Sequence, residues 1–572
     1  MLTKETVIQT LEEIATLLEL TGENLFKSRA YHNAARNLEK IDTDFSELVR
    51  QNKLAEVEGI GEAISKKLTE LIKTGRLEYY ERLKASVPPG HLEMLKIPGL
   101  GPKKIRTLYK QLEIKTVGEL EYACHENRLI DLKGFGKKTQ DNILAGIAKL
   151  KVYKERRLYA EAAAEAERLL DYLKKEKNIL SISIAGSLRR GNETIKDIDI
   201  LAASGHPEKL AGHFISCEQI EAVTASGETK VSVVLKSGIN ADLRIVNPAE
   251  YPYALHHFTG SKEHNAAIRG RANDMGIRMN EYGLFRGEKN IKCKNEEELF
   301  TALKLQFIEP ELRENMGEIQ AAEKNELPKL VEEKDVRGIF HVHTNFSDGG
   351  EPLESMALAA KKMGFAYIGI SDHSRSASYA GGLQAEDIKR QQELIDKLNE
   401  KLKPFHIFKG IESDILPDGS LDYDEKTLEL FDFVIAAVHS SFNMSAAEMT
   451  ARIKKALQNK YATMLAHPTG RLLLSREPYA VKMDEIIDAA AKFGKAIEFN
   501  ANAHRLDLDW RHCIYARKKG VKIAINPDAH QSAGLQDIGF GVKIARKGWL
   551  SKEDCLNCLN LEEMKEYLSK NK

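Results

Sequence analysis

Seven short apolar segments after residue 337, each followed by a stretch of helical character, place the tightest limits on how this chain can fold. The first is "GIFHVH", which begins at residue 338, and the last is "VKIAINPDAH", which ends at residue 530. Strands that alternate with helices pair in parallel, and seven in series favour a barrel. Functional side chains in such barrels lie at the carboxyl ends of the strands. We therefore expect a distorted (β/α)7 barrel with a site at that end.

The ends of these segments carry many side chains that bind metals. The motif "HVHTNFSDG" begins the series, and its two histidines share one face of a strand, which suits a single ion. One histidine at a strand end is more often an ordinary polar residue, but six strand ends with His, Asp or Glu favour a metal site. Mixed imidazole and carboxylate ligands suit Mn²⁺ or Zn²⁺ better than Mg²⁺. The candidate ligands are His341, His343, Asp348, His373, Glu412, His439, His467, Asp528 and His530.

A second group of acidic residues follows a glycine turn in "SIAGSLRRGNETIKDIDIL", residues 183–201. Asp197 and Asp199 are two apart in an apolar strand, so both project from the same face. Adjacent carboxylates resist ionisation unless a cation lies between them. Asp242, in the later strand "INADLRIV", can complete a set that holds two Mg²⁺ ions. The alternative is a polar strand edge exposed to solvent, which the glycine turn and the two arginines before the aspartates disfavour.

Near the amino terminus, one pattern occurs three times: an apolar residue, a G-x-G turn and a helix that is basic early on. The segments are "VEGIGEAISKKL", "IPGLGPKKIRTL" and "LKGFGKKTQDNIL". Such a turn exposes unpaired N–H groups at a helix start, where a phosphate can bind. The repetition favours helix-hairpin-helix motifs, which hold the DNA backbone without reading its sequence, over plain turns of a helical bundle. The glycines concerned are Gly59, Gly61, Gly99, Gly101, Gly134 and Gly136.

Composition narrows the class of protein only slightly. The 572 residues suggest about four structural units. The 85 basic and 85 acidic residues cancel, so total charge argues neither for nor against a polyanionic partner. Six scattered cysteines disfavour a disulfide scaffold, and we find neither a signal-peptide pattern nor an apolar run that could span a membrane. We expect a cytoplasmic protein without a membrane partner.

The motifs "GSLRRG", "DIDIL", "ADLRIV" and "HHFTGSKEHNAAIRGRANDMGIRMNEYGLF" together resemble the palm and thumb of family X DNA polymerases. The helix-hairpin-helix region is similar to the same family, so the resemblance covers residues 1–315. It implies that Asp197, Asp199 and Asp242 are catalytic and hold two Mg²⁺ ions. The residues implied to contact the incoming nucleotide are Gly186, Ser187, Arg190, Phe258, Gly260, Asn265 and Arg269.

Within that set, the first three residues face the triphosphate, Phe258 and Gly260 face the sugar, and Asn265 and Arg269 approach the nascent base pair. His257 stands where polymerase beta-like enzymes have tyrosine, which affects how strictly a ribose is excluded. The resemblance also places Lys67 at the position of a Schiff-base lyase lysine. A surface lysine that contacts phosphate is the alternative there.

Residues 336–572 look like a PHP (polymerase and histidinol phosphatase) domain, with all nine usual ligand positions present. That family implies up to three Mn²⁺ or Zn²⁺ ions and phosphoester hydrolysis. Both resemblances in this order match bacterial family X DNA polymerases with a C-terminal PHP domain. In that group the domain is associated with Mn²⁺-dependent 3′–5′ exonuclease activity and with cleavage at abasic sites.

We therefore predict a multidomain α+β and α/β protein that fills short DNA gaps in base excision repair. Its partners are gapped or primed DNA and dNTPs, and we expect a monomer in the cytoplasm, associated with the nucleoid. Alternatives are a nucleotidyltransferase acting on RNA or small molecules, a DNA-gap-binding scaffold, and a polymerase whose PHP domain is a phosphatase or only structural. The predicted domains are an 8-kDa-like DNA-binding domain (1–85), a helix-hairpin-helix fingers-like subdomain (86–150), the palm (151–250), the thumb (251–315), a linker (316–335) and the PHP domain (336–572).

Overall fold

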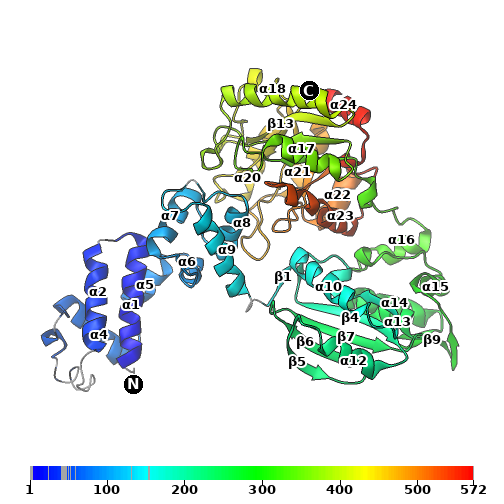
Figure 1. The fold of residues 1–572 in the computed structure, drawn as a ribbon, viewed down its shortest axis with the longest axis horizontal. Helices are drawn as coiled ribbons and strands as arrows, with labels where there is room; N and C mark the ends of the chain where they lie inside the picture. Colours follow the sequence, from blue (N-terminus) through cyan, green and yellow to red (C-terminus); the bar gives the residue numbers. More distant parts are fainter. Residues whose placement is uncertain are drawn as a thin grey trace. The chain divides into compact units, whose positions relative to one another are not determined.

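The structure is a computed structural model that describes residues 4–23, 25–39, 48, 51, 53–57, 59–130, 132–151 and 155–570. The chain divides into two compact units, which we describe separately (Figure 1). The first contains Met1–Cys124 and Arg128–Leu150, and the second contains His125–Asn127 and Lys151–Lys572. Among the described residues, no helix has both the length and the apolar character needed to cross a membrane.

The first unit is helical, as its amphipathic sequence pattern predicts. One apolar core joins the first helices and includes Leu11, Ile14 and Leu68, and a second core includes Ile105 and Leu108. The helices are α1 (Lys4–Thr21), α2 (Leu25–Glu39), α4 (Glu62–Thr74), α5 (Glu78–Ala85), α6 (Pro89–Met94), α7 (Pro102–Leu112), α8 (Val117–His125) and α9 (Lys137–Lys151), with a 3₁₀ turn η1 (Leu54–Glu56).

Each predicted G-x-G turn lies directly before a helix. Gly61 and Gly101 are the N-caps of α4 and α7, and α9 begins after the third turn. The first glycine of each turn has a positive φ, of 80° at Gly59, 80° at Gly99 and 91° at Gly134. Residues with a Cβ rarely adopt this backbone conformation, so the glycines are needed for the turn. The predicted helix-hairpin-helix arrangement is thus present.

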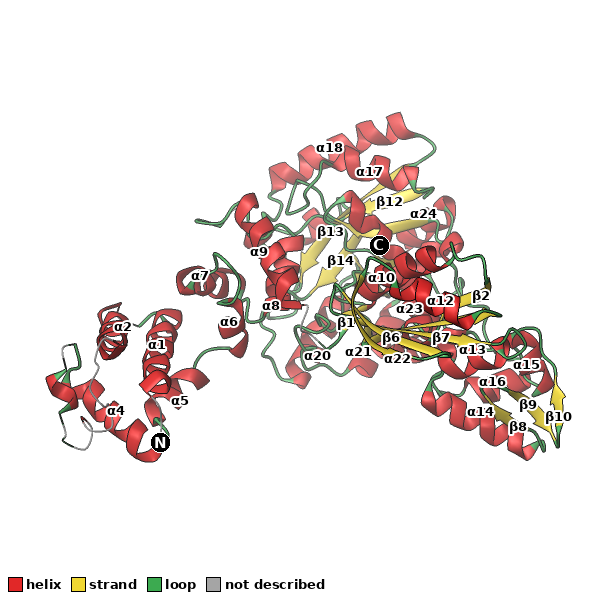
Figure 2. Ribbon diagram, turned by 60° about the horizontal axis from the view of Figure 1, so that its bottom comes forward, coloured by secondary structure: helices red, strands yellow, loops and turns green. Residues whose placement is uncertain are grey.

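The palm contains a five-stranded sheet in the order β2-β4-β7-β6-β5. Figure 2 labels β2, β6 and β7 of this sheet. Helices α10 (Tyr159–Leu173) and α12 (Pro207–Ile215) contribute to its core with Leu169 and Phe214, which pack with Ile198 and Ile200 of β4. The strands are β2 (Ile179–Ile184), β4 (Asp197–Ser204), β5 (Ile220–Ser226), β6 (Lys230–Leu235) and β7 (Asn240–Val246); the one-turn helix α11 (Gly186–Arg189) follows β2, and β1 (Arg157–Leu158) pairs with β3 (Thr194–Ile195).

The thumb follows with three α-helices and a small antiparallel sheet. Its elements are α13 (Tyr251–Thr259), α14 (Lys262–Asp274), β8 (Arg278–Asn280), β9 (Gly283–Arg286), β10 (Lys289–Ile291), α15 (Glu296–Ala302) and η2 (Pro310–Leu312).

The segment 316–335, predicted as a linker, has more structure than a linker requires. It contains α16 (Glu318–Lys324) and the turn η3 (Glu333–Asp335). Ile319 and Ala322 of α16 belong to the thumb core, and the fully buried Glu318 contacts His264 Nδ1 at 2.6 Å. The helix has seven residues and only these two core contacts, which is too short a pattern to show apolar periodicity.

The carboxyl-terminal part forms the predicted barrel. Seven strands lie in sequence order with every neighbouring pair parallel, and a bridge from Val342 to Ala529 brings the first strand beside the last. The strands are β11 (Gly338–Val342), β12 (Tyr367–Ile370), β13 (His406–Asp414), β14 (Phe433–Ala437), β15 (Ala462–Leu465), β16 (Ala496–Asn500) and β17 (Ile523–Asn526). The main helices are α17 (Leu353–Lys362), α18 (Ala385–Leu402), α20 (Ala446–Leu457), α21 (Met483–Phe493), α22 (Trp510–Lys518), α23 (Ile538–Lys547) and α24 (Leu561–Lys570). The short helix α19 (Glu425–Leu428) and the turns η4 (Ser378–Ala380), η5 (Ser532–Asp537) and η6 (Leu556–Cys558) complete it.

Candidate active sites

The three predicted palm aspartates come together because β4 and β7 are adjacent and parallel. Asp199 and Asp242 are directly opposite each other in the register, and Asp197 lies two residues earlier on β4. Lys230, on β6, places its Nζ 2.7 Å from Asp242 Oδ2. Lys230 and Arg244 are thus two cations near three carboxylates at this end of the sheet.

The charges of this group are only partly balanced. Burial raises the pKa of Asp199 to about 6, and the neighbouring carboxylates of Asp197 and Asp242 add to the effect. Oxygen ligands that are crowded and short of positive charge suit a hard divalent cation. The donor set of the palm therefore fits the predicted magnesium ions.

A cavity of about 390 Å³ adjoins these aspartates and reaches from the palm to the thumb. Nine predicted site residues line it, while Asp242 lies beside it in register with Asp199. The nine are Gly186, Ser187, Arg190, Asp197, Asp199, Phe258, Gly260, Asn265 and Arg269. The remaining lining residues are Arg244, His257, Ser261 and Lys262. Residues that the sequence assigned to triphosphate, sugar and base contacts thus share one cavity.

Two neighbouring arginines have different environments. Arg190 donates from Nε to Glu314 Oε1 at 2.9 Å and from Nη1 to the Thr259 carbonyl at 2.6 Å. Arg189 donates to the Thr259 hydroxyl and to Glu296, each at 2.6 Å, and does not line the cavity. Of these two arginines, Arg190 is the one placed to meet a ligand in the cavity.

Sequence reasoning missed Arg244 and Lys230, two cations near the aspartates of this site. Arg244 lies two residues after Asp242 on β7, with its guanidinium carbon 4.3 Å from the centre of the Phe258 ring. Its signal was present in "ADLRIV", because residues two apart in a strand share a face. Lys230 gave no such signal, since only the pairing of β6 with β7 brings it to Asp242.

Lys67, the candidate lyase residue, lies on α4 between two tyrosines. Its Nζ donates to the Tyr31 hydroxyl at 2.9 Å and sits 4.2 Å from the centre of the Tyr79 ring. The side chain is partly exposed. These contacts hold the amine in place, and its role as a nucleophile stays a prediction.

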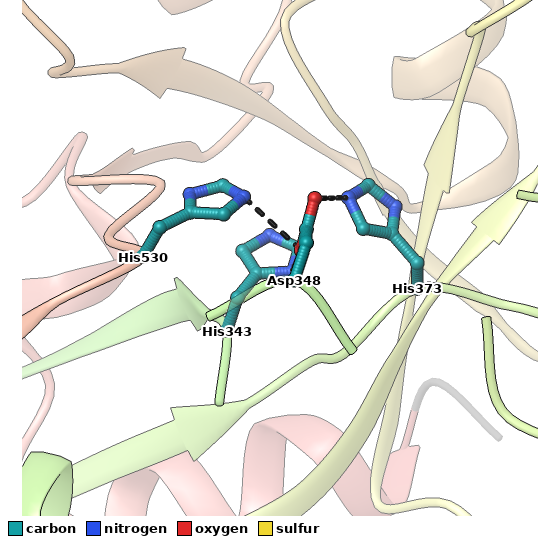
Figure 3. A group of neighbouring side chains, drawn as sticks. All are labelled: His343, Asp348, His373 and His530. Atoms are coloured by element: carbon teal, nitrogen blue, oxygen red, sulfur yellow. Dashed lines mark ion pairs between the residues drawn. The ribbon is translucent and has the colours of Figure 1, made fainter. Parts of the chain in front are cut away.

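The nine predicted barrel residues gather at the carboxyl ends of the strands, as expected. Figure 3 shows one group, in which His373 and His530 face Asp348 at 3.5 and 3.4 Å, with His343 beside them. In each of four overlapping groups the donor atoms lie within 4.8 Å of one another. The groups are His343, Asp348, His373 and His530; His341, Glu412 and His467; His341, His343 and Asp528; and His373, Glu412 and His439.

Burial and mutual charge dominate this second site. Burial opposes ionisation of Glu412, yet His439, His341 and His373 outweigh it and hold the pKa of this carboxyl well below its usual range. Burial, with His530 and His373 beside it, lowers the pKa of His343 to about 3. Both ring nitrogens of His343 are buried without a hydrogen bond among the described residues. Buried imidazoles and carboxylates in this state fit several transition-metal ions.

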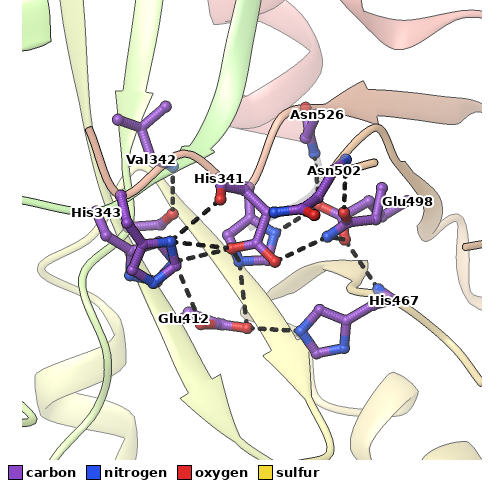
Figure 4. A network of polar contacts seen from close by, with 12 residues as sticks. His341, Val342, His343, Glu412, His467, Glu498, Asn502 and Asn526 are labelled. Atoms are coloured by element: carbon purple, nitrogen blue, oxygen red, sulfur yellow. Dashed lines mark hydrogen bonds and ion pairs between the residues drawn. The ribbon is translucent and has the colours of Figure 1, made fainter. Parts of the chain in front are cut away.

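Two carboxylates that sequence reasoning missed orient the candidate ligands. Glu498 lies 2.6 Å from His341 Nδ1 and accepts the backbone N–H of His467 at 2.8 Å (Figure 4). Asp414 lies 2.6 Å from His439 Nδ1. Such partners fix the ring orientation and leave the other ring nitrogen for a metal. Both were visible as acidic residues in strand ends, "AIEFNAN" and "GIESD", but nothing in the sequence separates a ligand from its partner.

The backbone at this site is strained. His341, His467 and Asp528 have φ values of 57°, 24° and 52°, in the left-handed region that favours glycine. Each such residue costs roughly 1–3 kcal/mol, and strain of this kind clusters at functional sites. Three of the nine candidate ligands are thus held in costly conformations.

Comparison with protein families agrees with this arrangement of domains. A helix-hairpin-helix domain matches residues 3–77, and a SAM-like helix-hairpin-helix tandem matches residues 92–149. A DNA polymerase beta thumb matches residues 254–314, and a PHP domain matches residues 340–502.

Curated relatives fall into two groups. The DNA polymerase/3′-5′ exonuclease PolX of Bacillus subtilis (strain 168) is 39% identical over 572 residues, which covers 99% of this chain and 100% of that protein. A probable phosphatase of Thermoanaerobacter sp. (strain X514) is 26% identical over 253 residues, 41% of this chain and 96% of the relative. A probable phosphatase of Caldicellulosiruptor bescii is 30% identical over 210 residues, 34% of this chain and 80% of the relative. On the full-length similarity and the matched domains, the chain belongs to the family X DNA polymerases that carry helix-hairpin-helix domains, a polymerase beta thumb and a C-terminal PHP domain.

Proposed function

We propose that this chain is a DNA polymerase that also removes nucleotides from 3′ ends. The observation that carries the proposal is the coexistence of two separate acidic and histidine sites in a chain similar over its full length to a polymerase with exonuclease activity. The candidate metal ligands of the barrel and the residues that line the palm cavity have no member in common. The substrates are DNA and dNTPs.

At the palm, Asp197, Asp199 and Asp242 would hold two Mg²⁺ ions, which supply positive charge to the reacting phosphate. Ser187 and Arg190 bind the triphosphate, and Phe258 and Gly260 limit the space at the sugar. Asn265 and Arg269 contact the nascent pair. The cavity that these residues share with the aspartates supports the assignment.

At the barrel, the nine candidate ligands would hold up to three Mn²⁺ or Zn²⁺ ions, which supply Lewis acidity for phosphoester hydrolysis. Glu498 and Asp414 hold His341 and His439 in the orientation needed for binding.

We further propose that the protein acts in the cytoplasm, with the nucleoid, as a monomer that fills short gaps in base excision repair. The glycine turns at Gly59, Gly99 and Gly134 support contact with DNA phosphates. Cleavage at abasic sites and removal of a deoxyribose phosphate by Lys67 belong to the same proposal. The domain boundaries given above are proposed with it.

A labelled one-nucleotide gapped duplex with a 5′-phosphate tests the proposal. We expect the wild type to extend the primer with dNTPs and Mg²⁺, and to shorten it with Mn²⁺ when dNTPs are omitted. Asp199→Ala should lose extension alone, and His341→Ala should lose shortening alone. Equal loss of both activities in either variant contradicts two independent sites.

A second candidate for the barrel is a phosphatase, because relatives that match this part of the chain are named probable phosphatases. The same duplex carrying a 3′-phosphate separates the two. Release of inorganic phosphate without loss of a nucleotide identifies a phosphatase, and release of nucleotides identifies the exonuclease.

A further inference from the structure

A largely buried network of ion pairs joins the barrel to the last residues of the thumb. Helix α23 contributes three cations, and the residues 309–314 contribute the acids. Glu311 receives Lys543 Nζ at 2.9 Å and Arg546 Nε at 2.7 Å. Burial opposes ionisation of Glu311, but these two cations outweigh it and lower its pKa to about 2.

Lys547, the last residue of α23, has a different set of partners. Its Nζ donates to Glu314 Oε1 and, at 3.4 Å, to the backbone carbonyl of Arg190. The side chain is only 2% exposed and its amine lies 4.8 Å from the centre of the Trp510 ring. A lysine of the barrel thus contacts the backbone of Arg190, a residue that lines the nucleotide cavity.

The same carboxylate holds Arg190. Glu314 Oε1 accepts from Arg190 Nε at 2.9 Å as well as from Lys547, and the Thr259 carbonyl accepts from Arg190 Nη1 at 2.6 Å. These bonds fix the plane of a guanidinium that lines the cavity. Gly191, next in the chain, packs on α23, since a Cβ there would lie 3.4 Å from Lys543 Cγ.

The net charge of Arg190, Glu314 and Lys547 determines how strongly this group attracts a triphosphate. A buried carboxylate paired with Arg190 alone would cancel the charge that the arginine presents to a triphosphate. With Lys547 as a second partner, the group of three carries one net positive charge below about pH 8, because burial lowers the pKa of Lys547 to about 8. Removing one member of a buried ion pair leaves the remaining charge uncompensated, which is strongly unfavourable.

We propose that Lys547 of the barrel is a positioning residue for the polymerase: through Glu314 it sets the orientation and the effective charge of Arg190 toward the nucleotide triphosphate. The inference rests on the proposed polymerase function. If Lys547 has this role, the nucleotide site of the palm is incomplete without a side chain of the PHP domain. A polymerase variant altered only in the barrel should then bind nucleotides poorly.

The test measures KM for dNTP and kcat on gapped DNA. Lys547→Met should raise KM roughly fivefold to twentyfold with little change in kcat. Without Lys547, the negative charge of Glu314 is balanced by Arg190 alone, so Arg190 attracts the triphosphate less strongly. Lys547→Arg should restore most of the affinity. Arg546→Met is the matched control, because it removes a cation of the same helix and interface that does not contact Arg190. Exonuclease activity checks that the barrel of each variant is folded.

Glu314→Gln tests the acid itself. The amide can still accept the bond from Arg190 but carries no charge, so this variant should lower KM and should reduce the effect of Lys547→Met in the double variant. Glu311→Gln should leave KM unchanged. If Lys547→Met fails to fold, the comparison of KM between Glu314→Gln and Glu311→Gln still tests the proposal.

The proposal is overturned if Lys547→Met leaves KM unchanged, if Arg546→Met raises it equally, or if Glu314→Gln and Glu311→Gln have the same effect. Failure of the proposed function has another signature, namely that the wild type incorporates no nucleotide at all.

Discussion

Asp199 is buried beside two other carboxylates, and its pKa is raised to about 6. Above that pH the Asp199 carboxyl is charged in both the folded and the unfolded chain. Only in the folded chain is this charge buried beside other carboxylates, which is unfavourable. Asp199→Asn should therefore raise the free energy of unfolding of the metal-free palm at pH 8 by about 1–3 kcal/mol. Unfolding in the presence of a chelator measures this, and the same variant should synthesise no DNA.

The stabilisation by Asp199→Asn should decrease as the pH falls through about 6. The folded wild type then binds a proton at Asp199, which removes the unfavourable buried charge. Asp171→Asn is the control, since that carboxylate is 76% exposed. A stabilisation that is equal at pH 8 and pH 5 would refute the electrostatic explanation.

Glu498 holds His341 through Nδ1 and leaves its other nitrogen for a metal. Glu498→Gln keeps the shape of the side chain but can also present its amide to the ring, so the tautomer is no longer fixed. We expect Mn²⁺ affinity to fall about 10- to 100-fold, measured by calorimetry, with synthesis by the palm retained. Glu400→Gln, on the exposed face of α18, should change neither property.

The turn between β2 and α11 brings the backbone very close to Asp199. Gly186 has a φ of 59°, and a Cβ there would lie 2.1 Å from Asp199 Oδ2. Gly186→Ala should displace that carboxylate and reduce synthesis at least 100-fold, with the exonuclease unaffected. Primer extension and shortening measure the two activities.

Gly205→Ala provides the comparison, because no atom lies within 4 Å of a Cβ at that palm residue. Retention of synthesis in Gly186→Ala would show that Asp199 can move without loss of its function.

Elements with strong local signals could be predicted from the sequence. The barrel strands are continuous apolar runs that end in His, Asp or Glu, so their order and the site that they share were both predictable. The helix α16 was not, because its two core contacts, Ile319 and Ala322, give no periodic pattern. Its buried Glu318 looked like one more charge in a charged stretch.

In both sites, the contacts that could not be predicted from the sequence are mainly those between residues of distant elements. Lys230 meets Asp242 only through the pairing of β6 with β7, and Lys547 meets Arg190 across more than 350 residues of chain. Sequence spacing carries no information on such contacts. Ligand types and their strand positions could be predicted, whereas the residues that hold them needed the fold.

For the whole molecule, the barrel should depend on metals more than the palm does. Six imidazoles and three carboxylates converge in its interior, and metal ions bound there stabilise only the folded state. Addition of Mn²⁺ at about 100 times its dissociation constant should stabilise the barrel by about 2.7 kcal/mol for each ion bound. Calorimetry with a chelator and then with Mn²⁺ gives the shift.

His343→Ala should reduce that shift, while Asp199→Ala should leave the barrel transition where it is. A midpoint that does not respond to Mn²⁺ in the wild type would rule out a site formed by these nine residues.

The candidate ligands of the barrel are drawn from both ends of its sequence, from His341 after the first residues of β11 to His530 beyond β17. A ribosome that has just added residue 500 has already completed the palm and thumb, yet Asp528 and His530 do not exist at that moment. The site that shortens DNA is therefore still incomplete when every residue of the palm and thumb has been added. A chain that ends before those two residues also lacks Lys547, so it should degrade no DNA and should bind nucleotides poorly.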